Sequence, residues 1–391
     1  MTKMLSLSQL GTLRNGMNYD RDSVVTGCKI IGVADFGGRV FPDYTSLQEI
    51  DSSIVSDDDL LREGDILFVR SNGNKNLVGR SMFIKDIREP ICYSGFCIML
   101  RPKRDIILPQ YLFYVLRSPF CRKQYSYSQQ TNITNLSQSV LGSVTVPVPD
   151  YDEQIKIAKI LYDIDKKIEN NNLICTELEA MAKTLYDYWF VQFDFPDENG
   201  KPYRASGGEM VWNEQIKREI PKGREVTSVG KIAPVRTGKE DANFATLNGR
   251  YKFFTCSQES LLCDMPAFAG HAVLIAGNGD FNVKHYTGEF NAYQRTYVLI
   301  PENSEYYGIM YMAAKNQIQI LKNGSNGSIV KFITKGDVEN IPVLIPTDNL
   351  IVSQLNSILT KIEHCEKETD ELTKLRDWLL PMLMNGQARV E

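Results

Sequence analysis

The chain has 391 residues, 43% of them hydrophobic, and its eight cysteines are scattered without a Cys-x-x-Cys pair. This length suffices for two or more domains with buried cores, and no stretch approaches the roughly 18 to 20 apolar residues that cross a bilayer. The N-terminus is too polar for a signal peptide, and scattered cysteines are typical of reduced thiols, so we expect a cytoplasmic protein. Three histidines leave little material for a histidine-based catalytic or metal centre.

The net charge of −4 conceals an alternation along the chain. Residues 1–148 and 201–346 each carry 17 Lys and Arg against 14 Asp and Glu, whereas 149–200 carry 5 against 12 and 347–391 carry 5 against 8. The phosphates of DNA are attracted to the first kind of block and repelled by the second. The pattern therefore favours nucleic-acid contact by the two basic blocks, although each is less basic than a typical isolated DNA-binding domain.

Short apolar runs rich in β-formers predict strands in both basic blocks. In chain order, the predicted strands are Lys29–Val33, Ile66–Val69, Phe96–Leu100, Val144–Val148, Tyr251–Thr255, Ala272–Ala276, Thr296–Ile300 and Ile341–Ile345. Helices are predicted at Pro109–Ser118 and Tyr306–Leu321. Strands mixed with few helices indicate α+β domains rather than doubly wound parallel sheets.

The chain also contains an internal repeat. The matching segments are Gly64–Gly73 with Gly270–Gly279, Val144–Pro149 with Ile341–Pro346, and Arg14-Asn15-Gly16 with Arg236-Thr237-Gly238. A long helical stretch follows each copy, so the order is domain, helix, domain, helix. We assign 1–149 to the first domain, 150–195 to a central helix, 196–346 to a linker and the second domain, and 347–391 to a C-terminal helix.

Both helical stretches have the apolar spacing of a coiled coil, with steps of three and four from Leu161 to Trp189 and from Leu355 to Met382. Asn171 and Thr369 are polar interruptions, which can determine register. If the helices pair antiparallel, a pseudo-twofold axis relates the two repeats. Each domain could then read one half-site of DNA, at a separation set by the helices. The alternative is a pair of amphipathic helices that pack on separate domain cores.

The loop after the matched strand in each repeat carries residue types suited to base recognition. Arginine can contact guanine, asparagine can contact adenine, and glycine lets the backbone approach closely. The candidates are Arg70, Ser71, Asn72, Asn74, Lys75 and Arg80 in the first repeat, and Asn278, Asn282 and Lys284 in the second. An ordinary polar hairpin is the alternative for these loops.

A second pair of polar loops precedes the last strand of each domain. Their candidates for contact with phosphate or sugar are Gln130 and Asn132 in the first domain, and Ser325, Asn326 and Lys331 in the second. Solvation of a surface loop is the alternative. An aromatic cluster, Trp189, Phe190, Phe193 and Phe195, is expected to seat the second domain, with a partner-binding surface as the alternative.

The motifs of nucleotide and methyl-transfer chemistry are incomplete. The chain has no Pro-Pro pair, which the amino-methyltransferase signature requires, and Ala233 stands where a phosphate-binding loop ending at Gly238-Lys239 needs its first glycine. Gly277-Asn278-Gly279 does not extend to a full dinucleotide-binding pattern, because Asn282 occupies its sixth position. We therefore expect no catalytic and no metal-binding residue in this chain.

Leu178–Pro196, with the sequence LEAMAKTLYDYWFVQFDFP, resembles the central region of the specificity subunits of type I restriction–modification systems. The similarity continues through Asn199–Tyr203, Gly207–Trp212 and Ile220–Gly223, and Leu379–Val390 resembles the C-terminus of these subunits. Arg224 departs from the pattern, since an aromatic residue, usually Trp, often follows the Pro-x-Gly sequence.

The resemblance implies a non-catalytic subunit with two target-recognition domains, which reads a bipartite asymmetric target on double-stranded DNA. It implies two methyltransferase subunits as partners and, in the full complex, two translocating restriction subunits. S-adenosylmethionine, ATP and Mg would then belong to those partners, and this subunit would hold no cofactor. A stand-alone bipartite DNA-binding regulator and a nuclease or nickase are the alternatives.

Overall fold

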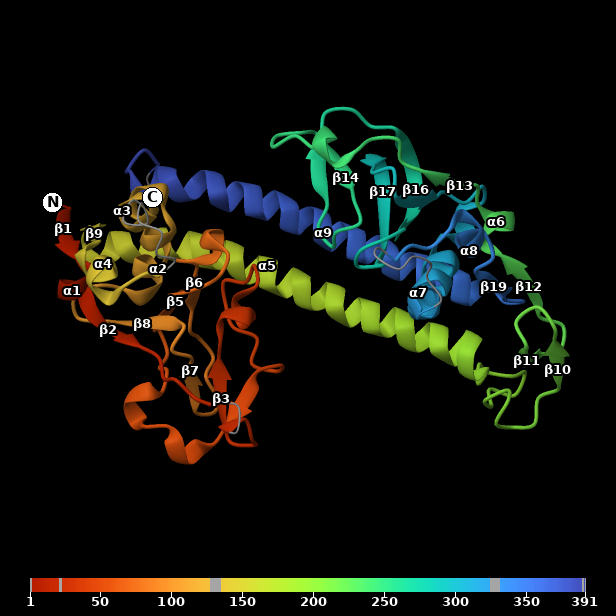
Figure 1. The fold of residues 1–391 in the computed structure, drawn as a ribbon, viewed down its shortest axis with the longest axis horizontal. Coiled ribbons are helices and arrows are strands. Elements are labelled where there is room, and N and C mark those ends of the chain that lie inside the picture. The colour runs from red at the N-terminus through yellow and green to blue at the C-terminus, as the bar shows by residue number, and fades with distance from the viewer. Residues whose placement is uncertain (1, 21–22, 127–134, 324–330, 389, 391) are drawn as a thin grey trace. The chain divides into compact units, whose positions relative to one another are not determined.

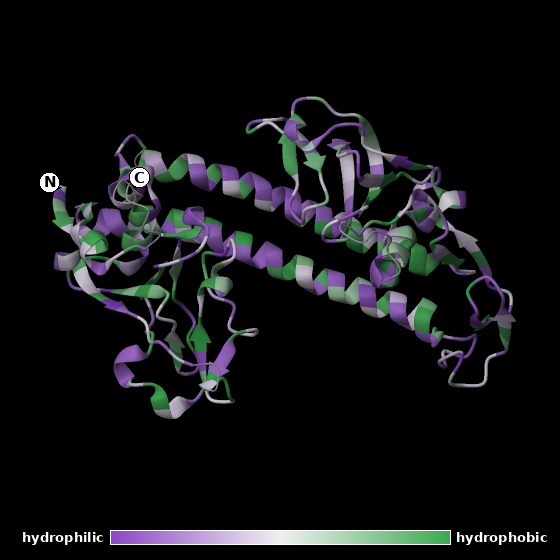
Figure 2. Cartoon of the chain, viewed as in Figure 1, coloured by the Kyte–Doolittle hydropathy of each residue, from purple (hydrophilic) through white to green (hydrophobic). Residues whose placement is uncertain are grey.

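A computed structural model describes residues 2–20, 23–126, 135–323, 331–388 and 390 of the chain (Figure 1). The chain divides into two compact units, one made of residues 1–169 with 369–391 and the other of residues 170–368. Two helices of 36 residues, α5 (Tyr151–Tyr186) and α9 (Asn349–Met384), each contribute one part to each unit. Their ribbons alternate between polar and apolar residues along their length (Figure 2), as expected of helices that bury one face.

The first unit contains two small sheets and a separate strand pair. The four-stranded sheet has the order β2-β8-β5-β6, the three-stranded sheet has the order β4-β3-β7, and β1 pairs with β9. The strands are β1 (Lys3–Ser6), β2 (Gly11–Asn15), β3 (Cys28–Ile31), β4 (Gln48–Ile50), β5 (Ile66–Val69), β6 (Ser81–Phe83), β7 (Ile91–Tyr93), β8 (Cys97–Pro102) and β9 (Thr145–Val148). The helices are α1 (Leu7–Leu10), α2 (Pro109–Arg117), α3 (Pro119–Ser126) and α4 (Gln138–Ser143).

Strand β5 lies between two hydrophobic cores, which explains why all four of its residues are apolar. Ile66 and Phe68 pack in a core shared with α2, the first part of α5 and the end of α9. Leu67 and Val69 pack on the opposite face, in a core shared with the three-stranded sheet. The two long helices meet in this unit through Asp165, which accepts hydrogen bonds from Arg376 (2.8 Å) and from the Tyr114 hydroxyl (2.9 Å).

The second unit has the same plan with one larger sheet. Its six-stranded sheet has the order β13-β18-β16-β17-β14-β15, β12 pairs with β19, and β10 and β11 form a hairpin. The strands are β10 (Met210–Asn213), β11 (Arg218–Pro221), β12 (Glu225–Ser228), β13 (Val235–Thr237), β14 (Tyr251–Phe254), β15 (Leu261–Cys263), β16 (Phe268–Ala276), β17 (Val283–Ala292), β18 (Thr296–Leu299) and β19 (Pro342–Ile345). The helices are α6 (Val229–Ile232), α7 (Tyr307–Asn323) and α8 (Lys335–Glu339).

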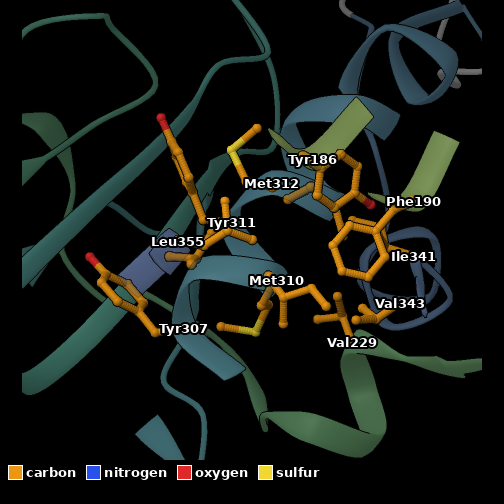
Figure 3. Close-up of a cluster of buried hydrophobic side chains, with 14 of the residues drawn as sticks. Tyr186, Phe190, Val229, Tyr307, Met310, Tyr311, Met312, Ile341, Val343 and Leu355 are labelled. Carbon is orange, nitrogen blue, oxygen red and sulfur yellow. The ribbon is translucent and has the colours of Figure 1, made fainter. Parts of the chain in front are cut away.

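The core of the second unit forms where α7 packs against the sheet and both long helices. Figure 3 shows Tyr186 of α5 and Phe190, which lies in the π-helical turn Asp187–Gln192 that follows, above Val343 of β19, with Met310 of α7 to the left of Val343. Leu355 of α9 belongs to the same cluster. In this unit α5 and α9 run antiparallel, because Asn171 donates to Glu368 (2.8 Å) and Cys175 donates to the Ile362 carbonyl (3.8 Å).

Strand register shows that the two units repeat one another. Val69 lies opposite Cys97, and Ala276 lies opposite Thr296, so the ends of β5 and β16 are equivalent. This register corrects the alignment of Gly64–Gly73 with Gly270–Gly279, which is wrong by one residue. The other two matched segments pair as predicted. Thr145 and Pro342 both face a serine at the end of the partner strand, and Arg14 and Arg236 face the equivalent residues Met99 and Val298.

The structure confirms the predicted α+β class and the two repeated domains. It also locates strands and helices at the predicted apolar runs. The bounds differ at several ends: β3 ends at Ile31 and Val33 begins a 3-10 helix, and Phe96 lies in the turn before β8 rather than in the strand. In the part of the chain that the structure describes, no helix combines the length and apolar character needed to cross a membrane.

Candidate nucleic-acid interface

Three segments meet where strand β5 ends in the first unit. The Arg70 N–H donates to the Phe96 carbonyl (2.8 Å), and the Leu136 N–H donates to the Arg70 carbonyl (2.8 Å). Ser71 and Asn135 form an antiparallel bridge. We call this region the β5 edge, and it comprises residues 70–80, 94–96 and 135–136.

The same three segments meet at the end of β16 in the second unit. The Gly277 N–H donates to the Arg295 carbonyl (2.8 Å), and the Ile333 N–H donates to the Gly277 carbonyl (3.0 Å). Asn278 and Phe332 form the equivalent bridge. We call this region the β16 edge, and it comprises residues 277–284, 293–295 and 331–333. At each edge, the loop after the matched strand is therefore hydrogen-bonded to the segment before the last strand of the domain. These two segments were separate candidates in the sequence.

Side chains of the first candidate loop hold its backbone in place. Asn72 accepts from the Asn74 N–H (2.8 Å), and Asn74 accepts from the Asn76 N–H (3.0 Å), so two amide turns lead into a short 3-10 helix at Lys75–Leu77. Asn74 and Lys75 are exposed. The loop therefore presents amide and ammonium groups from an ordered backbone.

The two arginines of this loop are half-buried and bind main-chain oxygens. Arg70 donates from Nη1 to the Gly95 carbonyl (3.2 Å), and Arg80 donates from Nη1 to the Gly37 carbonyl (2.6 Å). Since a guanidinium carries five N–H donors, each arginine keeps donors beyond these bonds. Their positive charge thus lies at the β5 edge with a fixed orientation.

The loop of the β16 edge is shorter, and its predicted residues serve different purposes. Asn282 donates to the Cys256 carbonyl (2.8 Å), and Lys284 donates to the Thr255 (3.1 Å) and Ser257 carbonyls. Burial lowers the pKa of Lys284. We therefore assign these two side chains to anchoring the segment after β14 and not to DNA contact.

The remaining predicted residues divide between described and undescribed segments. Asn278 is half-buried and Lys331 is exposed, and both lie at the bridge of the β16 edge. Gln130, Asn132, Ser325 and Asn326 lie outside the described residues.

The turns before β8 and β18 bring side chains to both edges that the sequence did not single out. Phe96 is 60% exposed, and Gln294 and Arg295 are exposed. Gly16 and Gly238 lie beneath these turns, where a Cβ would approach the Ser94 and Ala292 carbonyl oxygens to 2.2 and 1.8 Å. The sequence signal for these turns was the glycine that ends both matched motifs, at 14–16 and 236–238, because such a glycine marks a close approach of another backbone segment.

The aromatic cluster after α5 packs within the second unit. Phe190 and Phe193 are buried, while Trp189 stacks on Phe195 with ring centres 5.2 Å apart. The guanidinium of Arg224 lies 4.4 Å from the centre of the Phe195 ring. This arrangement favours the packing role predicted for the cluster.

A family model described as the type I restriction modification DNA specificity domain matches the chain twice, at residues 45–180 and 217–374. The chain belongs to this family. The two matches fall on the two repeats, and membership of the specificity family confirms the resemblance seen in the sequence. It favours a DNA-specificity role over a stand-alone regulator or a nuclease.

Two relatives in the specificity family illustrate the range of similarity. The specificity subunit of the type I restriction enzyme EcoDI of Escherichia coli is 36% identical over 180 residues, which cover 44% of this chain and 40% of that protein. The putative type I restriction enzyme MjaX specificity subunit of Methanocaldococcus jannaschii is 24% identical over 409 residues, which cover 98% of this chain and 92% of that protein.

A solved structure shares the fold of this family member. The crystal structure of the type I restriction–modification S subunit of M. genitalium covers 98% of this chain and 96% of its own, with a TM-score of 0.58 and 16% sequence identity. The overall fold of this chain is therefore also that of a solved type I restriction–modification S subunit.

Proposed function

We propose that this chain is the DNA-specificity subunit of a type I restriction–modification complex. Each repeat reads one half of a bipartite, asymmetric target on double-stranded DNA through its edge, the β5 edge in one and the β16 edge in the other. The chain itself catalyses no reaction. Two methyltransferase subunits bind to it and, in the full complex, two translocating restriction subunits join them.

The observation that carries this proposal is one backbone frame used twice with different side chains. The hydrogen bonds that join the three segments are the same at both edges. Arg70 at the β5 edge is replaced by Gly277 at the β16 edge, and Phe96 is replaced by Arg295. A subunit that reads two different half-sites needs loops in equivalent positions that carry different side chains for contact with the bases.

The distribution of charge along the chain also supports DNA contact by the two edges. The two basic blocks of the sequence contain the two edges, and the acidic blocks contain the long helices. On the basis of the family resemblance, we assign S-adenosylmethionine, ATP and Mg to the partner subunits and none of them to this chain.

Sequencing of methylated bases in a host that expresses this chain with a methyltransferase subunit of the same system tests the proposal. We expect one two-part methylated sequence, which appears only when both proteins are present. DNA cleavage or methylation by the purified chain alone, with Mg²⁺ or S-adenosylmethionine supplied, would contradict it. A bipartite footprint at nanomolar concentration without any partner would favour the stand-alone regulator.

A further inference from the structure

A four-residue turn precedes β8 in the first unit and β18 in the second. The Cys97 N–H donates to the Ser94 carbonyl, and the Thr296 N–H donates to the Tyr293 carbonyl, both at 2.8 Å. Phe96 and Arg295 therefore occupy the same position, the third residue of the turn.

The same neighbours hold both turns. The second residue of each turn donates its N–H to the segment after β2 or β13, from Gly95 to Met17 (2.6 Å) and from Gln294 to Glu240 (2.8 Å). The carbonyl of the third residue accepts from the first residue beyond β5 or β16, Arg70 or Gly277, at 2.8 Å in both cases. These bonds hold the backbone of Phe96 and Arg295 before any ligand binds, which reduces the entropy lost on binding.

Both third-position side chains are exposed although their backbones are fixed. Phe96 is 60% exposed and forms one wall of a cavity of about 430 Å³, which Tyr19, Val24 and Ser94 also line. The structure thus presents an apolar surface at the β5 edge and a guanidinium at the equivalent point of the β16 edge.

The two edges carry an arginine at different positions of the shared backbone arrangement. At the β5 edge it comes from Arg70, which donates to Gly95 in the turn. At the β16 edge the equivalent residue is Gly277, where a Cβ would meet the Arg295 carbonyl at 2.6 Å and no side chain fits. Arg295 supplies the guanidinium there instead. One scaffold therefore offers a different chemical pattern in each unit.

The geometry points to Phe96 and Arg295 as specificity-determining residues, each of which reads a base in its own half of the target. Phe96 contacts the methyl group of a thymine, and Arg295 donates two hydrogen bonds to O6 and N7 of a guanine. The assignment rests on the proposed function, because it requires the two edges to contact DNA.

Modified duplexes test these contacts in the complex of the chain with its methyltransferase subunit. Each thymine of the methylated sequence is replaced in turn by deoxyuridine, which lacks the methyl group, and each guanine by 7-deazaguanine, which lacks N7. We expect one thymine replacement to weaken binding by about fourfold, the effect of one buried methyl group. One guanine replacement in the other half should weaken binding by roughly tenfold.

Variants then connect each base to its residue. Phe96→Ala should abolish the effect of deoxyuridine and leave the effect of 7-deazaguanine unchanged, and Arg295→Ala should do the reverse. Arg295→Lys keeps the charge but not the planar pair of donors, so it should retain less guanine preference than the wild type. Phe120→Ala and Arg250→Ala replace exposed residues outside the edges and serve as matched controls.

Three outcomes would overturn the assignment: no sensitivity of the wild-type complex to either modified base, unchanged sensitivity in the variants, or full guanine preference in Arg295→Lys. Melting temperatures of the variants separate a lost contact from a lost fold, and Phe96→Leu gives a second test that keeps an apolar side chain. If the wild-type complex methylates no two-part sequence, the proposed function itself fails.

Discussion

Arg224 takes the place of an aromatic residue that many members of the family carry after the Pro-x-Gly sequence. Its guanidinium lies over the Phe195 ring, and Phe195 stacks on Tyr203 with ring centres 4.9 Å apart. The Arg224 side chain is buried, its Nη1 has no hydrogen-bond partner, and burial lowers its pKa. The planar guanidinium therefore packs on the stacked aromatic rings at this position.

We expect Arg224→Ala to lower the free energy of unfolding by about 1 to 2 kcal/mol, because it removes a buried cation–π contact. Arg224→Trp should recover most of this loss, since it supplies a flat apolar ring with one N–H donor in place of the five donors of a buried guanidinium. Urea unfolding measures both. Lys222→Ala, at an exposed position next to the same turn, serves as the control and should leave the midpoint unchanged. Equal losses in the Ala and Trp variants would contradict the stacking role.

Two glutamates on α9 have pKa values that are shifted in opposite directions. Glu363 accepts from the Tyr307 hydroxyl (2.6 Å), and His285 Nδ1 lies 3.1 Å from the same carboxylate oxygen. Burial raises the pKa of Glu363, but hydrogen bonds from His285, Tyr307 and Thr287 outweigh it and the net pKa is lowered. For Glu366, burial dominates and raises the pKa.

The opposite shifts predict opposite effects of neutralisation. Glu363 stabilises the fold above its ordinary pKa of 4.5, and this contribution is lost as pH falls through the lower folded-state pKa. Glu366 contributes below its ordinary pKa and loses that contribution as pH rises through the raised folded-state value. At neutral pH we therefore expect Glu363→Gln to lower the melting temperature and Glu366→Gln to raise it. Shifts of the same sign in both variants would refute the assignment.

At the scale of elements, local patterns were predictable and distant pairings were not. The periodicity of α5 and α9 is contained in each segment, so both helices were found from their own residues. The start of β8 depends on hydrogen bonds from Arg70 and Met17, which lie far away in sequence, so Phe96 was placed in the strand. The one-residue error between β5 and β16 has the same cause, because register is defined by partner strands.

The candidate interface shows the same limit. The sequence identified the loop beginning at Arg70 from its composition, and the structure places that loop directly after β5, hydrogen-bonded to the turn before β8. The sequence did not single out Arg295, because no local motif distinguishes this arginine from the others. It could not show that Lys284 is directed to carbonyls of the segment after β14, since that contact joins residues 27 and 29 positions apart.

Two polar residues of the long helices differ in whether their side chains have hydrogen-bond partners. Asn171 is buried and donates to Glu368, whereas the buried Thr369 hydroxyl oxygen has no hydrogen-bond partner. Thr369→Val keeps the shape and removes the unsatisfied group, so we expect the free energy of unfolding to rise by about 1 kcal/mol. Thr360→Val, at an exposed position on the same helix, should change it by less than about 0.5 kcal/mol. A loss of stability in Thr369→Val, measured by urea unfolding, would show that the hydroxyl is satisfied.

At the scale of the whole molecule, the proposed DNA contacts lie in the basic blocks of the chain. Lys75 and Lys331 are exposed at the two edges, within the basic blocks, while Lys166 is exposed on α5, within an acidic block. A lysine at a phosphate displaces condensed counterions when DNA binds, and a lysine away from DNA does not. Salt dependence therefore reports where the backbone of DNA runs.

We expect Lys75→Gln and Lys331→Gln each to reduce the slope of log K against log salt concentration by about 0.9, the value for one phosphate contact. The loss should be nearly the same for specific and non-specific duplexes, because phosphate contacts carry no sequence information. Lys166→Gln removes the same charge from a helix and should leave the slope unchanged. Binding of the complex with its methyltransferase subunit, titrated at several salt concentrations, measures all three. An equal reduction in Lys166→Gln would place the DNA backbone along α5 and contradict the assignment of DNA contact to the two edges.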